Sequence, residues 1–218
     1  MATDTGNRLT SNQFARARDA RLAWLLSRHP ATAGMLAAMG LFTTRKKASK
    51  RLARLARRGA IRLLGTVSLK DGRPEHVYGR GRWKTDNLLH EVLLTQVCRR
   101  IDAEEVRRGP GDTDSDLRAD AELWINGRRY FLELDRGTMG YEEVIRKRFS
   151  RYATSTDFVL WVCPNDSRME GLRRRGSLLR RTALFTTFGQ LLADPHGRIW
   201  RDADGATAAL PRSGGHGA

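Results

Sequence analysis

The sequence has few cysteines and no long hydrophobic run, and both shortages narrow the possible classes of protein. Its 218 residues include only two cysteines, Cys98 and Cys163, which lie far apart in apolar segments. Two isolated cysteines provide neither a disulfide framework nor a zinc site, and they are typical of buried thiols in a reducing compartment. No apolar stretch approaches the length that spans a bilayer, and no signal peptide opens the chain. We therefore expect a cytoplasmic protein with no membrane partner.

Acidic residues are also scarce relative to basic ones. The chain has 40 Lys and Arg residues against 24 Asp and Glu residues, which gives a formal net charge of +16. Such an excess predicts a polyanionic partner, and nucleic acid is the simplest candidate. Hydrophobic residues still make up 40% of the chain, so we expect a folded core in one large domain or two small ones.

The first part of the chain has the pattern of three helices followed by a β-hairpin. Thr32 is suited to cap the second helix and Thr43 or Thr44 the third, which Gly59 ends. Asp71-Gly72 is typical of a hairpin turn. This succession is the order of a winged helix-turn-helix, in which the third helix enters the major groove of DNA. The expected helices cover 15–29, 33–39 and 44–58, the strands 61–69 and 74–78, the whole domain 15–82, and a disordered N-terminus 1–14.

The third helix has a one-sided distribution of charge. Ala48, Leu52 and Leu55 recur at helical spacing and predict a buried stripe. Basic residues cover the rest of the helix, and Lys70 and Arg73 form a basic wing beside the hairpin turn. A run of bases is often only a solvated face, but this run has one sign and the expected architecture supplies a way to dock on duplex DNA. The predicted DNA-binding residues are Arg45, Lys46, Lys47, Lys50, Arg51, Arg54, Arg57, Lys70 and Arg73.

The most specific local signal is Asn126-Gly127, the dipeptide preferred by a two-residue type I′ turn, because both residues need positive φ. Counting outward from this turn pairs Asp120 with Glu133 across the hairpin. Alternation with a period of two then puts Glu122 and Asp135 on the same face as these two acids. Like charges directly opposite repel each other. The face is either solvated or holds a divalent cation, since hard cations bind carboxylate oxygens.

The residues after the hairpin predict an α/β arrangement. Arg148 falls inside the apolar stripe of a helix expected over 141–152, whereas Lys147 points away. A cation on the core-facing side needs an anion, and the acidic hairpin is adjacent in sequence. The apolar run 157–163 predicts a strand buried on both faces. The other expected elements are helices over 87–101, 168–181 and 189–193 and a strand over 183–187, in a second domain over 83–201 followed by a flexible tail over 202–218.

Four segments form a further pattern when they are taken together with the winged helix: His90-Glu91, Ala119–Ala121, Phe131–Thr138 and Arg148–Tyr152. This pattern, over about residues 15–200, resembles the replication-relaxation family of bacterial plasmids and other mobile elements. The resemblance implies a role in plasmid replication and DNA relaxation, with double-stranded DNA and replication proteins as partners; a homodimer is a further candidate assembly. The predicted fold class is α/β, an N-terminal winged helix-turn-helix followed by a PD-(D/E)XK-like mixed sheet flanked by helices.

The PD-(D/E)XK nuclease core, which the family's second domain resembles, has an acid at the start of one strand and an acid-x-Lys triplet on the next. The resemblance makes Asp120 the first acid and Glu133 the second, with Glu91 as an auxiliary acid. Asp135 occupies the lysine position of the triplet, and Arg148 occupies the helix position of a migrated lysine. Lysine can lose its proton and help to activate water, whereas arginine stays charged.

Two functions of different classes follow. The first is a metal-dependent DNA endonuclease or nickase, in which Asp120, Glu133 and Asp135 hold Mg²⁺ or Mn²⁺ and Arg148 binds the phosphate. The second is a DNA-binding replication protein, or a transcriptional regulator, whose nuclease-like domain has lost catalysis and whose acids pair with Arg148 and Arg136. An RNA-binding module fits less well, because the deep major groove of RNA does not admit a recognition helix. We favour the DNA-binding replication protein.

Overall fold

The computed structural model of the chain describes residues 11–69, 72–83, 85–108, 117–176 and 179–212. It divides into two compact units, one ending at Thr95 and the other beginning at Gln96, within helix α4 (Leu88–Ile101). We expected the boundary after Arg82. The division lies later because Leu88 and Val92, in the first half of α4, belong to the hydrophobic core of the first unit. No helix of the described residues is long and apolar enough to cross a bilayer.

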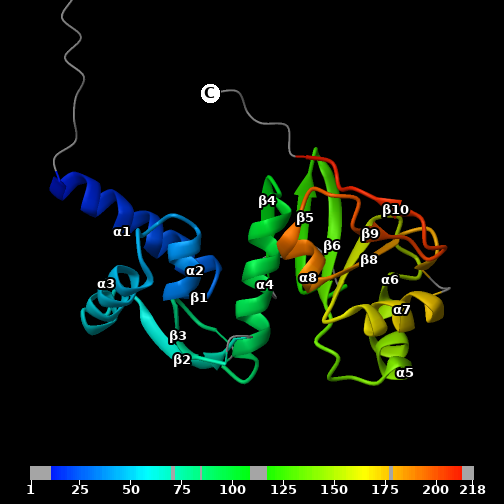
Figure 1. Cartoon of the computed structure of the whole chain (residues 1–218), viewed down its shortest axis with the longest axis horizontal. Coiled ribbons are helices and arrows are strands. Elements are labelled where there is room, and N and C mark those ends of the chain that lie inside the picture. Colours follow the sequence, from blue (N-terminus) through cyan, green and yellow to red (C-terminus); the bar gives the residue numbers. More distant parts are fainter. Residues whose placement is uncertain (1–10, 70–71, 84, 109–116, 177–178, 213–218) are drawn as a thin grey trace, which may run out of the picture. The chain divides into compact units, whose positions relative to one another are not determined.

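The first unit contains helices α1, α2 and α3, the first half of α4 and a small antiparallel sheet with the strand order β1-β3-β2. Figure 1 shows α1, α2 and α3 on one side of the β2–β3 hairpin. The predicted helices and hairpin are confirmed, and the side chains of Thr32 and Thr44 accept hydrogen bonds from the N–H groups of Met35 and Lys47. The elements are α1 (Ser11–Arg28), β1 (Ala31–Thr32), α2 (Ala33–Ala38), α3 (Arg45–Arg57), β2 (Arg62–Ser68) and β3 (Pro74–Gly79).

The expected disorder of the N-terminus is wrong for its last four residues, since α1 already begins at Ser11. A polar sequence does not exclude a helix start, because the first four N–H groups of a helix have no partner within it and can bond to water. The N-terminal residues 1–10 lie outside the described residues.

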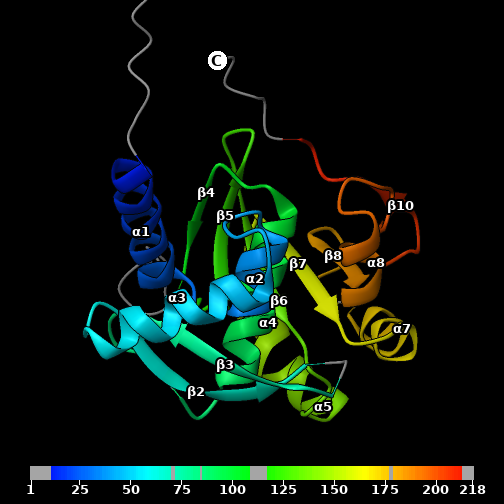
Figure 2. The ribbon, with the colours of Figure 1, turned by 60° about the vertical axis from the view of Figure 1, so that its left-hand side comes forward.

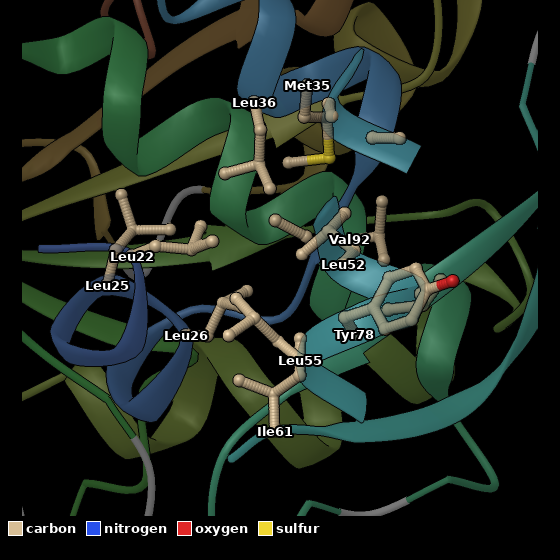
Figure 3. Close-up of a cluster of buried hydrophobic side chains, with 14 of the residues drawn as sticks. Leu22, Leu25, Leu26, Met35, Leu36, Leu52, Leu55, Ile61, Tyr78 and Val92 are labelled. Atoms are coloured by element: carbon tan, nitrogen blue, oxygen red, sulfur yellow. The ribbon is translucent and has the colours of Figure 1, made fainter. Parts of the chain in front are cut away.

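One hydrophobic cluster holds the first unit together (Figure 3). The predicted stripe of α3 is confirmed, because Ala48, Leu52 and Leu55 are all buried. They pack with apolar residues from the other elements, namely Leu22, Leu25 and Leu26 of α1, Met35 and Leu36 of α2, and Ile61, Tyr78 and Val92. Burial of this face fixes which face of α3 remains exposed, so the core decides where its basic residues point.

The second unit contains a seven-stranded mixed sheet with the order β10-β9-β8-β7-β6-β5-β4. Figure 2 shows β5, β6, β7 and β8 following one another across it. Strands β6, β7 and β8 are parallel and the remaining pairs antiparallel, which confirms the predicted α/β class. The elements are β4 (Glu105–Arg107), β5 (Ala121–Ile125), β6 (Arg128–Leu134), α5 (Tyr141–Val144), η1 (Ile145–Phe149), α6 (Ser150–Tyr152), β7 (Phe158–Cys163), α7 (Asp166–Arg175), β8 (Ala183–Thr187), α8 (Phe188–Ala193), β9 (Trp200–Arg201) and β10 (Thr207–Ala208).

The β5–β6 hairpin has the predicted turn and register. Asn126 and Gly127 have φ values of 50° and 69°, as a type I′ turn requires. Ile125 pairs with Arg128, and the ladder continues to the pair of Ala121 and Leu132. One step further outward, Asp120 lies opposite Glu133.

One face of this sheet is covered by the helices that follow the hairpin. Phe131 of β6, Trp161 of β7 and Phe185 of β8 share a cluster with Phe149 and Leu172 of the helices. The ring centroids of Phe149 and Trp161 are 4.5 Å apart. Glu133 pairs with Trp161 across the parallel ladder, so the Glu133 side chain lies on this covered face. The strand β7 is buried on both faces, as predicted.

Two predictions for the C-terminal part are wrong. Helix α7 ends at Arg175, before the expected 181, because its C-cap is Gly176 and glycine has a low helix propensity. The expected flexible tail is ordered to residue 212, because β10 pairs with β9 and the Asp202 carboxylate accepts hydrogen bonds from the N–H groups of Asp204 and Ala206. The remainder of that tail, 213–218, lies outside the described residues.

Candidate functional site

The two acids at the open end of the hairpin lie next to each other. Glu133, on β6, is only 1% exposed. Asp120 directly precedes β5, and its Oδ2 accepts a hydrogen bond of 2.8 Å from the N–H of Leu134. This bond joins the Asp120 side chain to the strand that carries Glu133, so the predicted meeting of the two acids on one face is confirmed.

A cation from the next helix lies between these acids. Nη1 of Arg148 donates a hydrogen bond of 2.8 Å to Oε2 of Glu133 and lies 3.7 Å from Oδ2 of Asp120. The hydroxyl of Tyr152 donates a hydrogen bond of 2.6 Å to the other oxygen, Oε1 of Glu133. Both oxygens of the buried carboxyl group therefore have a donor. We name Asp120, Glu133, Arg148 and Tyr152 the acid–arginine cluster.

A π-helical turn brings Arg148 and Tyr152 to the sheet. Val144 and Phe149 are both buried, but residues five apart on a regular α-helix point about 140° away from each other. The turn η1 resolves this conflict, since the N–H of Ser150 bonds to the carbonyl of Ile145, five residues back. Such bulges frequently occur at functional sites. The inward direction predicted for Arg148 is confirmed, and Lys147 is exposed as expected.

Burial dominates the electrostatics of the cluster. The pKa of Glu133 is raised to about 8, because burial and the neighbouring Asp120 carboxylate oppose its charge more strongly than Arg148 and the Tyr152 hydroxyl favour it. Burial and the same carboxyl group raise the pKa of Tyr152. For Arg148, burial lowers the pKa, but the attraction of Glu133, Asp120 and Asp135 raises it by more. The guanidinium therefore stays charged while Glu133 exchanges its proton near neutral pH.

Asp135 belongs to a separate ion pair that the sequence did not reveal. Its Oδ2 accepts a hydrogen bond of 2.5 Å from Nε of Arg168, and its Oδ1 lies 3.3 Å from Nη2. Arg168 also donates to the carbonyl of Met139 and stacks over the ring of Tyr141 at 4.4 Å. Thirty-three positions separate the two partners, so no local pattern connects them, and their pairing depends on how α7 packs beside β7.

Three other acids and bases from the predicted site have different surroundings. Glu122 is fully buried on β5, on the same face as Phe131, with which it pairs. Glu91 lies on α4 in the part of that helix that belongs to the first unit, and its role as an auxiliary acid stays a prediction. Arg136 is half-buried.

Each acid that the sequence predicted as a metal ligand contacts an arginine in this structure. Both oxygens of Glu133 accept hydrogen bonds from Tyr152 and Arg148, and Asp135 is held by Arg168. The Arg148 guanidinium contacts both Asp120 and Glu133. Among the described residues, no group of three or more His, Cys, Asp or Glu side chains is placed to hold a metal ion.

The basic residues of α3 form the second candidate site. Besides Arg45, which is also exposed, five of its predicted DNA-binding residues are exposed and lie away from the buried stripe: Lys46, Lys47, Lys50, Arg54 and Arg57. We name the surface formed by these five residues the basic face. Arg73, in the hairpin, is also exposed, whereas Lys70 lies outside the described residues.

Two arginines of α3 form ion pairs with acidic residues of the first unit. Arg51 donates to both carboxylate oxygens of Asp19 on α1 and is only partly exposed. Arg45 lies 3.5 Å from the carboxylate of Glu75, which is 8% exposed and also accepts a hydrogen bond from the N–H of Gly34. These contacts fix α3 against α1 and β3, so the two arginines position the basic face.

Comparisons of the chain with protein-family models, with curated proteins and with solved structures gave no match.

Proposed function

We propose that the chain is a protein that binds double-stranded DNA, of the plasmid replication-relaxation type, and that it docks through α3 and the β2–β3 hairpin. The observation that carries this proposal is the basic face of α3. The five exposed lysines and arginines of this face lie on a helix whose opposite side is fixed by a hydrophobic core. The exposed side of such a helix fits the major groove, where some lysine and arginine side chains contact phosphates and others bind the edges of the DNA bases.

The arrangement of the first unit supports the same proposal. Its order α1–β1–α2–α3–β2–β3, with β3 in the centre of the sheet, agrees with a winged helix-turn-helix. In that motif the third helix is the recognition helix, and the hairpin that follows is the wing. The net charge of +16 would further strengthen attraction to the DNA backbone.

Removal of charge from the basic face tests the proposal. Lys50→Ala with Arg54→Ala should weaken binding to a short duplex by at least about tenfold at low salt, since each of these side chains is expected to neutralise a phosphate. The control is Arg16→Ala with Arg21→Ala, which removes two exposed charges from α1 and should have a much smaller effect. Fluorescence anisotropy of a labelled duplex measures both. Equal losses in the two variants would remove the assignment of α3.

The second unit supports two candidate roles. A nuclease-like domain without catalysis, in a replication protein or a transcriptional regulator, is favoured by Arg148, because this cation already contacts Asp120 and Glu133. A metal-dependent endonuclease is favoured by the position of the acids, with Asp120 before β5 and Glu133 on the adjacent strand, as in the PD-(D/E)XK pattern. We favour the first role, because a divalent ion would have to displace Arg148.

Nicking of supercoiled plasmid distinguishes these two roles. If the domain is not catalytic, the wild-type chain leaves the plasmid intact with Mg²⁺ and with Mn²⁺, while it still retards duplex DNA. Nicking that is lost in Asp120→Asn and in Glu133→Gln, but kept in Glu142→Gln, would instead establish the endonuclease. The exposed Glu142 serves as the control because it lies on α5, outside the acid–arginine cluster.

A further inference from the structure

A hollow of about 550 Å³ lies in the second unit, at the edge of the sheet where β6, β7 and β8 begin. Arg128 and Phe158 are the first residues of β6 and β7, Thr182 directly precedes β8, and all three line the hollow. Glu133 is five residues further along β6, about 17 Å at the rise of a β-strand. The hollow is therefore separate from the acid–arginine cluster.

The lining of this hollow is strongly basic. Three arginines, Arg128, Arg180 and Arg181, line it together with three hydroxyl-bearing residues, Ser155, Thr156 and Thr182. No carboxylate lines it among the described residues. Guanidinium and hydroxyl donors around a concave surface are the usual partners of a phosphate group.

Neighbouring contacts hold these donors in place. The side chain of Arg128 stacks over the ring of Phe158 at 4.5 Å. Asp157, just before β7, accepts hydrogen bonds of 2.9 and 2.7 Å from Arg129 on β6, and its N–H donates to the hydroxyl of Ser155. These bonds fix the segment that carries Ser155 and Thr156, so less conformational freedom is lost when a ligand binds.

One of the arginines has an exchangeable partner. Arg180 donates to the carboxylate of Asp204 at 2.9 Å, and the side chains are 67% and 59% exposed. An ion pair this exposed contributes little stability. A ligand with more negative charge can therefore take the Arg180 guanidinium from Asp204.

We propose that this hollow is a binding site for a phosphate-bearing ligand. The proposal is independent of DNA docking through α3, since the hollow and the basic face belong to different units. The phosphate can come from a free nucleotide or from the backbone of a nucleic acid, and both sources present the same oxygens to the arginines.

The test uses the full chain and two single substitutions, each of which removes one positive charge. Arg181→Ala changes the hollow, whereas Arg174→Ala removes an exposed arginine of α7 that does not line it. Thymidine 5′-monophosphate, titrated by calorimetry, represents the free nucleotide. A short duplex without terminal phosphates represents the backbone. Loss of one charge-assisted contact should weaken binding about tenfold.

The outcomes separate the two sources. If Arg181→Ala weakens nucleotide binding and Arg174→Ala does not, the ligand is a free phosphate compound. If the nucleotide does not bind but Arg181→Ala weakens duplex binding more than Arg174→Ala, the ligand is the backbone. Equal effects of the two substitutions in both titrations, or no binding of either probe, overturn the proposal.

A second variant tests the exchange of partners at Arg180. Asp204→Asn removes the competing carboxylate and should tighten binding of the same probe about twofold, as expected for an exposed ion pair. Binding that is unchanged or weaker in this variant contradicts the proposed site.

Discussion

At Glu133, burial and hydrogen bonding act in opposite directions on one carboxyl group. Burial favours the neutral form, while the Arg148 guanidinium and the Tyr152 hydroxyl favour the charged one. Because the pKa ends at about 8, the group carries a proton in the folded protein over a range where an unfolded carboxyl group has lost it. The stability of the second unit should therefore depend on pH near neutrality.

Replacing Glu133 with Gln should remove this dependence. Between about pH 5 and 8 the folded wild type binds a proton that the unfolded chain releases, so its free energy of unfolding should fall as the pH rises, by at most about 1.4 kcal/mol per unit. It should level off above pH 8. Chemical denaturation at several pH values measures the slope, which Glu133→Gln should flatten and the exposed control Glu142→Gln should leave intact. An unchanged slope in Glu133→Gln would contradict the role assigned to this proton.

Removing the cation should strengthen the dependence of stability on pH, whereas Glu133→Gln removes it. Arg148→Met leaves Asp120 and Glu133 without a neutralising partner, and breaking a buried pair costs about 3 kcal/mol. The loss should be largest at pH 8 and above, where Glu133 is ionised, and smaller at pH 5. Arg146→Met, at an exposed position of the same helix, should change stability by less than about 0.5 kcal/mol. A loss in Arg148→Met that is the same at both pH values would show that packing, and not charge, explains it.

The sequence predicted some of these residues and missed others for a physical reason. The meeting of Asp120 and Glu133 follows from a local rule, since a two-residue turn sets the register of every pair in the hairpin. The partners Arg168 for Asp135 and Asp19 for Arg51 depend on tertiary packing between elements far apart in sequence. The contact of Tyr152 with Glu133 had a signal in the sequence. Tyr152 belongs to the apolar stripe of the helix expected over 141–152, and a buried tyrosine hydroxyl usually finds a hydrogen-bond partner.

Among the elements, α3 shows most directly how the sequence determines a surface. The threonine before it satisfies a free N–H, the apolar stripe fixes its orientation, and the basic face is left exposed. The π-helical turn η1 was not predictable in the same way. Its residues have no distinctive pattern, and the turn forms because Val144 and Phe149 both pack against the sheet.

The cap of α3 can be tested by itself. Thr44→Ala removes the hydrogen bond to the N–H of Lys47 and should lower the stability of the first unit by about 1 kcal/mol. Thr43→Ala, an exposed neighbour outside the helix, should cause almost no change. Urea denaturation of the two variants compares them directly. Equal stability of Thr44→Ala and the wild type would mean that the packing of α3 alone determines where the helix begins.

At the scale of the whole molecule, buried and exposed charges have different roles. Most acids with buried side chains are bound to arginines: Glu133 to Arg148, Asp135 to Arg168 and, in the first unit, Glu75 to Arg45. Many basic residues of the described part of the chain are exposed, and α3 carries a dense group of them. Composition alone predicted a polyanionic partner, but it could not indicate which surface would meet that partner.

The most direct test of the central claim is the salt dependence of duplex binding. We expect the logarithm of the wild-type binding constant to fall linearly with the logarithm of the salt concentration. In Lys50→Ala with Arg54→Ala, two fewer phosphates are neutralised, so the slope should be smaller by about 2. In Arg16→Ala with Arg21→Ala it should stay at the wild-type value. A slope that is the same in all three proteins would contradict docking through the basic face of α3.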